Sequence, residues 1–205
     1  MGIKERRERD RNQTRQLILD AAREQFVRDG TATMRGIADA IEYSPTAIYG
    51  HFSDKDALLT ELAACDFRAF TGQFSAVPEN MPPRERLELL GRNYVRFAQE
   101  NPSQYRHLFM TPKEHVSAHA APEEDAYTVL ISAVEGCVAA GAFHPHHSDA
   151  ETIAQSLWMA LHGACAMHLT MPAGGKVKLL PLAAMANEII ALLMAGLAQP
   201  ARGAR

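Results

Sequence analysis

Apolar side chains recur at intervals of three and four residues along nearly the whole chain, and this spacing constrains the fold more than any other feature. Residues at these intervals share one face of an α-helix, whereas a half-buried strand needs strict alternation of apolar and polar residues. Ile18, Ala22 and Phe26 show the helical spacing, and Gly30 follows them as a helix stop. No segment alternates like a strand. The sequence therefore predicts an all-α protein.

Capping and turn residues divide the chain into about nine helices. Two starts are predicted from capping boxes, Ser53 with Asp56 and Ser148 with Glu151. Seven of the expected helices span about 13–29, 34–41, 53–74, 102–110, 125–140, 148–171 and 182–197. A short helix is expected from residue 44, and another from the end of the proline-rich break at 77–83 to residue 100. We expect a three-helix unit over residues 1–56 and a helical bundle over residues 57–205.

Bulk composition excludes several classes of protein. Apolar residues make up 47% and charged residues 22%, as in ordinary globular proteins, so the chain has enough apolar surface to fold. No apolar run approaches the ~18 residues that a membrane span needs, and no signal peptide is expected. The cysteines are odd in number and widely spaced, at Cys65, Cys137 and Cys165. This fits a reduced protein, so a cytoplasmic location is expected. The formal net charge of -3 means that any binding of nucleic acid must be local.

Residues 33–55 carry the most informative pattern. Two short amphipathic helices follow each other closely, with Ile37, Ala38 and Ile41 facing inward on the first and Ile48 and Phe52 on the second. This layout is typical of a helix-turn-helix, whose second helix enters the major groove of DNA. The exposed residues of the second helix are small or able to form hydrogen bonds: Thr46, Ala47, Tyr49, Gly50 and His51.

These helices and their neighbours resemble the N-terminal signature of TetR-family regulators. The matched residues are Thr14, Arg15, Ile18, Leu19, Ala21, Ala22, Phe26, Gly30, Ile37, Ala38, Ser44, Pro45, Ile48, Tyr49, Gly50, His51, Phe52, Lys55, Leu58 and Leu59. The resemblance implies binding to a double-stranded DNA operator. It further implies that the base-reading end of the second helix is formed by Ser44, Pro45, Thr46 and Ala47. Contacts to phosphates are implied for Tyr49, His51 and Lys55, and a contact from the preceding helix for Arg35.

Two features depart from the family pattern. The link between Gly30 and Ile37 is about two residues shorter than usual, and Glu42-Tyr43 stands where Gly-Val is typical. A residue other than glycine in a left-handed turn costs about 1 kcal/mol, which a folded domain tolerates. The departures therefore concern the details of docking on DNA rather than the class of protein.

The first fifteen residues hold six basic side chains, namely Lys4, Arg6, Arg7, Arg9, Arg11 and Arg15, and three acidic ones, Glu5, Glu8 and Asp10. Two interpretations remain open for this segment. It is either a disordered basic arm that contacts the phosphates or the minor groove of DNA, or a solvated extension of the first helix with charge pairs three and four residues apart.

The C-terminal half resembles one branch of the same family, on Asn101-Pro102, Tyr105-Arg106, Leu108 to Met110 and Trp158-x-x-x-His162-Gly163. In that branch the C-terminal bundle encloses a cavity and forms a dimer. The candidate lining residues for a small-molecule effector, mostly apolar with a few polar groups, are Tyr94, Phe97, Met110, Tyr127, Trp158 and His162. The alternative is that these residues are plain core, as such a set of residues more often is.

The last two helices, about 149–171 and 182–197, are very apolar. Their spacing places Ile153, Leu157, Leu161 and Ala164 on one helix and Leu182, Met185, Ile189, Leu193 and Leu197 on the other. A two-fold operator needs a two-fold protein, so these helices are expected to form a homodimer contact. The alternative is the core of a monomer.

Metal and cofactor sites are not expected. The histidines near one another in the sequence are His115 with His119, then His144, His146 and His147, and finally His162 and His168 beside Cys165. None of these groups has the spacing of a zinc site with three or four converging ligands, although the turn at 144–147 is left open. Gly174-Gly175-Lys176 is not a phosphate-binding loop, because Thr170 and Val177 stand where glycine and Ser or Thr belong.

The leading hypothesis is a dimeric transcriptional repressor, not an enzyme, that a small molecule releases from a near-palindromic operator. A helical small-molecule carrier or enzyme that retains the N-terminal unit as a scaffold is the alternative, and a metal-responsive regulator is a third. Specific binding of DNA separates the first two, and metal analysis of the purified protein decides the third.

Overall fold

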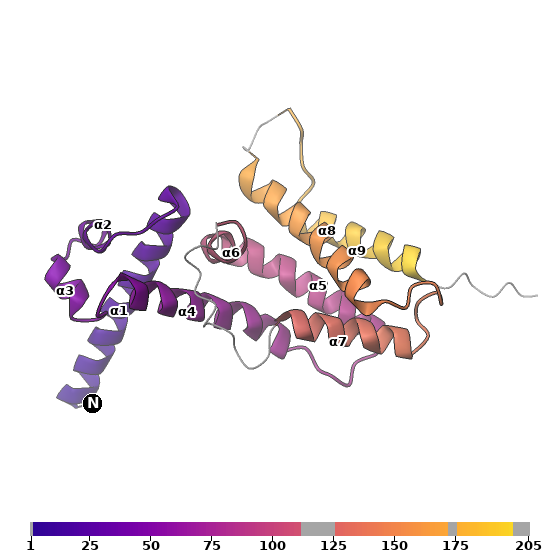
Figure 1. Cartoon of the computed structure of the whole chain (residues 1–205), viewed down its shortest axis with the longest axis horizontal. Helices are drawn as coiled ribbons and strands as arrows, with labels where there is room; N and C mark the ends of the chain where they lie inside the picture. Colours follow the sequence, from indigo (N-terminus) through magenta and orange to yellow (C-terminus); the bar gives the residue numbers. More distant parts are fainter. Residues whose placement is uncertain (1, 112–125, 172–175, 199–205) are drawn as a thin grey trace, which may run out of the picture. The chain divides into compact units, whose positions relative to one another are not determined.

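The computed structural model describes residues 2–111, 126–171 and 176–198, and these residues form nine α-helices. Apart from the helices they contain one isolated β-bridge, between Phe143 and Ala198. The helices, labelled in Figure 1, are α1 (Ile3–Asp29), α2 (Met34–Ala40), α3 (Pro45–Tyr49), α4 (Lys55–Ser75), α5 (Pro83–Glu100), α6 (Pro102–Phe109), α7 (Ala126–Ala139), α8 (Ala150–Thr170) and α9 (Leu182–Leu197). The predicted all-α class is confirmed.

The first helix is longer than its apolar spacing predicts. α1 begins at Ile3 instead of near Gln13, so the basic N-terminal segment is a helical extension and not a disordered arm. The extension lacks buried residues, which is why apolar periodicity missed it. Its Lys, Arg and Glu residues have high helix propensity, and the amide of Gly2 donates to Glu5 Oε2 at 3.0 Å.

Both predicted capping boxes are wrong by one residue. The carboxylate of Asp54, not the hydroxyl of Ser53, accepts the amide of Ala57 at 2.7 Å where α4 begins. At the start of α8 the side chain of Asp149, not Ser148, accepts the amide of Glu151 at 3.1 Å. In each case an aspartate directly follows the serine, and either residue type suits the cap. The sequence pattern therefore located the helix start but not the capping group.

The chain divides into two compact units, which are described separately. Among the described residues, the first unit holds 2–68 and 103–111, and the second holds 69–102, 126–171 and 176–198. α4 therefore starts in the first unit and ends in the second, and α6 from Ser103 onward groups with the N-terminal helices. The predicted functional boundary at residue 56 remains a prediction.

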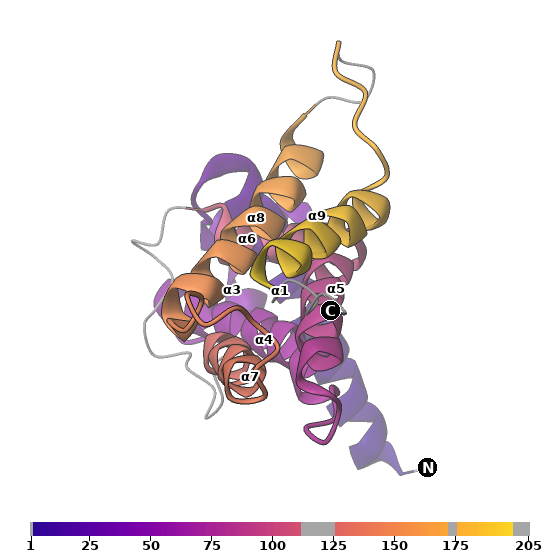
Figure 2. The same cartoon turned by 90° about the vertical axis from the view of Figure 1, so that its right-hand side faces the viewer.

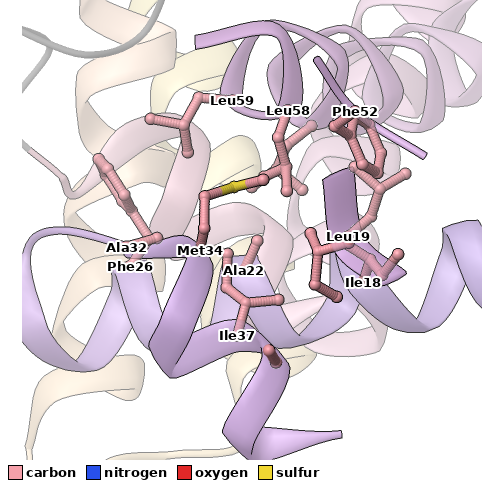
Figure 3. Close-up of a cluster of buried hydrophobic side chains, with 13 residues drawn as sticks. Ile18, Leu19, Ala22, Phe26, Ala32, Met34, Ile37, Phe52, Leu58 and Leu59 are labelled. Atoms are coloured by element: carbon pink, nitrogen blue, oxygen red, sulfur yellow. The ribbon is translucent and has the colours of Figure 1, made fainter. Parts of the chain in front are cut away.

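A single apolar cluster holds the first unit together (Figure 3). α1 contributes the predicted face with Ile18, Ala22 and Phe26, each at most 1% exposed. Ile37 and Ala38 of α2 and Ile48 of α3 are buried in the same cluster, and Ile41 is partly buried against it. Because burial of each large aliphatic or aromatic side chain contributes roughly 1.5–3 kcal/mol, this cluster fixes α2 and α3 on α1 and on the start of α4.

In the second unit α5 packs against α7, α8 and α9, and Figure 2 shows α8 and α9 side by side. Gly91 lies where α5 meets both of these helices. A Cβ atom at Gly91 would lie 3.1 Å from Leu161 Cδ1 and 3.2 Å from Ile190 Cδ1. The absence of a side chain on Gly91 therefore lets α8 and α9 approach α5 closely. None of the described helices has the combination of length and apolar character needed to cross a membrane.

Candidate nucleic-acid interface and effector site

Capping side chains set where α2 and α3 begin. The hydroxyl of Thr33 accepts the amide of Gly36 at 3.1 Å, while Gln25 on α1 accepts the amide of Thr33 at 2.8 Å. Ser44 caps α3 by accepting the amide of Ala47 at 3.2 Å, and Pro45 occupies the first helical position. These contacts satisfy amides that have no partner within the helix, so both short helices begin at defined residues.

The turn between α2 and α3 contains the left-handed residue that the sequence led us to expect. Glu42 has a φ of 58°, and among the described residues it is the one position other than glycine with positive φ. The amide of Tyr43 donates to the carbonyl of Ala38 at 2.9 Å, and that of Glu42 to Asp39 at 3.4 Å. This pair of bonds is a Schellman motif, which ends α2 and turns the chain toward α3.

The turn leaves one side of α3 exposed. Ile48 is completely buried, whereas Tyr49 is 54% exposed and Thr46 and Gly50 are exposed. Small and hydrogen-bonding groups on a short helix, held from behind by an apolar cluster, are what reading a major groove requires.

His51 lies at the end of α3 and is half-buried. Its pKa is lowered below the ordinary value, first by burial and then by the positive charges of Arg11 and Arg15. The neutral imidazole is therefore favoured at pH 7, and His51 would offer a phosphate a neutral N–H rather than a full positive charge.

Arg15 of α1 holds the end of α3 in place. Its Nη1 donates to the carbonyl of His51 at 2.6 Å, and its guanidinium carbon lies 4.2 Å from the centroid of the Phe52 ring. Its Nε donates to Glu61 Oε1 at 2.6 Å, and Nη2 pairs with the other oxygen of Glu61. One side chain thus ties together α1, the end of α3 and α4.

A buried polar network joins α1, α4 and α6 in the same unit. The carboxylate of Asp66, with no exposed surface, accepts from Arg23 Nε at 2.9 Å and from Arg23 Nη2 at 2.8 Å. It also interacts with His107 Nδ1 at 2.8 Å and accepts from Gln104 Nε2 at 3.0 Å. Arg23 bonds a second carboxylate, that of Asp20, at 2.6 Å. The buried charges are therefore compensated, as burial requires.

In the second unit, Tyr94, Trp158 and His162 form a hydrogen-bonded chain between α5 and α8. Trp158 Nε1 donates to Tyr94 Oη at 3.1 Å, and Tyr94 Oη lies 3.1 Å from His162 Nδ1. Because indole nitrogen only donates, the tyrosine hydroxyl accepts from Trp158, and the same oxygen is hydrogen-bonded to Nδ1 of His162. Burial lowers the pKa of His162, which favours a neutral ring.

Other aromatic rings flank this chain. The ring centroids of Tyr127 and Trp158 lie 5.9 Å apart, and the hydroxyl of Tyr127 donates to Glu151 Oε1 at 2.6 Å. Phe70 contacts Tyr94 edge to face, with their centroids 5.8 Å apart, and contacts Phe97 at 5.2 Å. Apolar rings around a few polar groups are the usual composition of a small-molecule site.

No group of three potential metal ligands converges within the described ranges. The rings of His144 and His146 stack with their centroids 4.8 Å apart, and the amide of His146 donates to Nδ1 of His144 at 3.3 Å. His115 and His119 lie outside the described residues.

Sequence models of known families cover both parts of the chain. Residues 18–62 match the model of bacterial regulatory proteins of the tetR family, and residues 87–193 match a tetracyclin repressor-like C-terminal domain. The chain belongs to the tetR family of bacterial regulatory proteins. It is therefore a DNA-binding transcriptional regulator with a helix-turn-helix formed by α2 and α3. The branch inferred from Trp158, His162 and Gly163 remains a prediction.

Solved structures share the fold of this TetR-family regulator over most of its length. A tetR-family regulatory protein from Rhodococcus RHA1 has 21% identity and a TM-score of 0.71, covering 91% of this chain and 97% of its own. The ketosteroid transcriptional regulator KstR2 of Mycobacterium tuberculosis has 17% identity, a TM-score of 0.71 and coverages of 91% and 96%. AibR, solved with isovaleryl coenzyme A and operator DNA, has 19% identity, a TM-score of 0.71 and coverages of 88% and 97%. No protein of curated function matches the sequence.

The predicted DNA contacts of the regulator lie together on its first unit. Arg35, Ser44, Pro45, Thr46 and Tyr49 are exposed, whereas Ala47, His51 and Lys55 are half-buried. Ser44 and Lys55 each make a local side-chain hydrogen bond as well. Ser44 caps α3, and Lys55 Nζ donates to the hydroxyl of Thr31 at 3.3 Å.

The predicted effector residues are only partly brought together. Tyr94, Trp158, His162 and Tyr127 are linked as described, and Phe97 is fully buried against Phe70. Met110 belongs to the first compact unit, so it is not placed with the other five.

Sequence reasoning missed the residues that hold these sites in position. The signal for the buried network was present in the sequence. Asp66 follows Leu59 and Leu62 at helical spacing, and Arg23 lies between Leu19 and Phe26 in the same way, so both charges fall on apolar faces. A charge on an apolar face predicts a buried partner. By contrast, the role of Phe70 could not be distinguished from ordinary core packing.

Proposed function

We propose that the protein is a homodimeric repressor that binds a near-palindromic operator and is released from it by a small molecule. The observation that carries the proposal is the exposed side of α3, where Thr46, Tyr49 and Gly50 project from a helix whose Ile48 is completely buried. In this proposal Ser44 to Ala47 read bases at the start of α3. Tyr49, His51 and Lys55 bind phosphates, and Arg35 binds at the edge of the groove.

The proposed dimer forms through residues 149–171 and 182–197, which include α8 and α9. Beside its buried residues, α9 carries the half-buried Met185 and Ile189 and the 64% exposed Leu192. On α8 the exposed apolar residues are Met159 and Met167. Apolar surface of this kind on two neighbouring helices suits an isologous contact between two copies.

The proposed effector is an apolar or aromatic molecule of modest size. Tyr127 and Trp158 would contact the apolar part of the effector. His162, which is hydrogen-bonded to Tyr94, would contact its polar group. AibR was solved with both an acyl coenzyme A and operator DNA, so one protein of this fold holds both kinds of ligand. At 19% identity this supports the type of mechanism and not the identity of the ligand.

The alternative is a helical small-molecule-binding protein or enzyme that retains the N-terminal unit as a scaffold. The exposed, hydrogen-bonding side of α3 favours the repressor, because a scaffold has no need of it. A repressor acts by binding, so we propose no catalytic activity, and its DNA partner implies a cytoplasmic location.

The test is protection of DNA next to the protein's own coding region from nuclease digestion. We expect a protected near-palindrome, weaker binding by the Tyr49→Phe and Lys55→Ala variants, and a decrease of about one in the salt slope for Lys55→Ala. Lys178→Ala is the matched control, since Lys178 is exposed in the second unit. Absence of protection by the wild-type protein would favour the scaffold alternative.

A further inference from the structure

The helical extension of α1 arranges its basic residues in a stripe. Lys4, Arg7, Arg11 and Arg15 are separated by three, four and four residues, so they share one side of the helix. Lys4, Arg7 and Arg11 are exposed. Arg6 and Arg9 project from the opposite side. One side of the helical extension is therefore richer in positive charge than the other.

Arg15 sets the direction in which the stripe faces. Its guanidinium donates to the carbonyl of His51 and stacks over Phe52, so the stripe faces the end of α3 at this point. Arg11, one turn earlier on the same side, is close enough for its charge to act on His51. Figure 1 shows α1 continuing past α3 and the start of α4 to the end marked N. The exposed part of the stripe thus begins beside the helix that is proposed to enter the major groove.

The length of the stripe suits a DNA backbone. At a rise of about 1.5 Å per residue, the eleven steps from Lys4 to Arg15 span roughly 17 Å, the axial length of about five base pairs. Arg15 is engaged with Glu61 and the end of α3, so it acts as an internal support. Lys4, Arg7 and Arg11 are held by no ion pair among the described residues and project from a preformed helix.

We propose that this stripe is a second DNA-binding surface, in which Lys4, Arg7 and Arg11 bind phosphates of the backbone next to the groove entered by α3. The inference rests on the proposed function, because the stripe can reach this part of the backbone only when α3 is bound in the groove. A helix that already presents its cations loses less conformational freedom on binding than a disordered arm. The surface reads no bases and adds affinity and length of contact.

The experiment compares two double variants of the full-length protein. Arg7→Gln/Arg11→Gln removes two charges from the stripe, and Arg6→Gln/Arg9→Gln removes the same number from the opposite side. Glutamine keeps a high helix propensity, and thermal melts establish that both proteins are folded. Binding to a fluorescent 40-base-pair duplex of mixed sequence is measured by anisotropy at several salt concentrations, since phosphate contacts do not depend on sequence.

We expect the stripe variant to lower the salt slope by about 1.8 and the affinity at 0.1 M salt by more than about tenfold. The opposite-side variant should change the slope by less than half as much, and Arg7→Lys/Arg11→Lys should restore it. Equal effects of the two double variants, or no effect of the stripe variant, would overturn the proposal. If Lys55→Ala weakens binding while the stripe variant does not, the DNA-binding function stands and the second surface is refuted. If the wild-type protein binds no duplex, both fail.

Discussion

The imidazole Nδ1 of His107 on α6 lies 2.8 Å from Oδ2 of Asp66 on α4, and this pair is buried within the unit that carries the helix-turn-helix. Because Arg23 of α1 bonds the same carboxylate, Asp66 links three helices through a single charged group. Removing that charge should therefore disturb the whole unit.

Asp66→Asn should lower the free energy of unfolding by about 3–5 kcal/mol, since it leaves the guanidinium of Arg23 buried without its main partner. Urea unfolding followed by circular dichroism measures the change. Asp20→Asn is the control, because Asp20 pairs with the same Arg23 but its side chain is 49% exposed, and it should cost about 1 kcal/mol or less. A loss below 1 kcal/mol for Asp66→Asn would show that the network contributes little.

The same carboxylate should make stability depend on pH in the acid range. Burial by itself raises the pKa of Asp66, but the bonds from His107 and Arg23 outweigh it and bring the pKa below the ordinary value. The stabilisation is therefore fully present above the ordinary pKa near 4 and is lost as the pH falls through the lowered pKa. Wild-type protein should lose stability more steeply than Asp66→Asn between about pH 5 and pH 2. Parallel curves would contradict this assignment.

Glu42→Gly should raise the free energy of unfolding by about 0.5–1 kcal/mol. The left-handed φ of 58° costs an L-residue about 1–2 kcal/mol, and the greater freedom of glycine in the unfolded chain offsets part of the gain. Glu42→Ala removes the same carboxylate but keeps the unfavourable conformation, so it should not stabilise. If both variants shift the urea midpoint equally, the effect comes from charge and not from the backbone.

Leu192→Glu should convert the proposed dimer to a monomer and reduce operator binding by at least tenfold, because it would bury a carboxylate in an apolar contact. Sedimentation equilibrium gives the oligomeric state, and anisotropy gives the affinity. Leu17→Glu is the matched control on α1, where Leu17 is 50% exposed and lies outside the proposed interface. A Leu192→Glu protein that remains dimeric would place the interface elsewhere.

Tyr94→Phe and Trp158→Ala should abolish the response to effector while operator affinity stays within about threefold of wild type. Tyr94→Phe removes only the hydroxyl that joins Trp158 to His162. Apolar and aromatic compounds that raise the melting temperature of the wild type are titrated against the protein–operator complex. An effector weakens DNA binding by the factor by which DNA weakens effector binding. Variants that melt normally and still release DNA would place the effector away from this chain of residues.

Much of the first unit followed from the sequence because its determinants are local. Apolar spacing located the helices, Ser44-Pro45 marked the start of α3, and the residues between the two short helices indicated a left-handed turn, found at Glu42. Helical periodicity depends on neighbours within four residues, and so do most caps, so these features can be predicted without knowing the fold. The N-terminal extension escaped because it has helix propensity without an apolar face.

Only the tertiary structure decided which distant side chains meet. Arg23 pairs with Asp66 across 43 residues, Arg15 reaches His51 across 36, and Tyr94 bonds Trp158 and His162 across 64 and 68. Sequence spacing placed Trp158 and His162 one turn apart but could not name their partner, and sequence reasoning overlooked Asp66 and Arg23 altogether. A helix face fixes the direction in which a side chain points. The packing of one helix against another depends on side-chain shapes along both helices, and it determines which residues that side chain contacts.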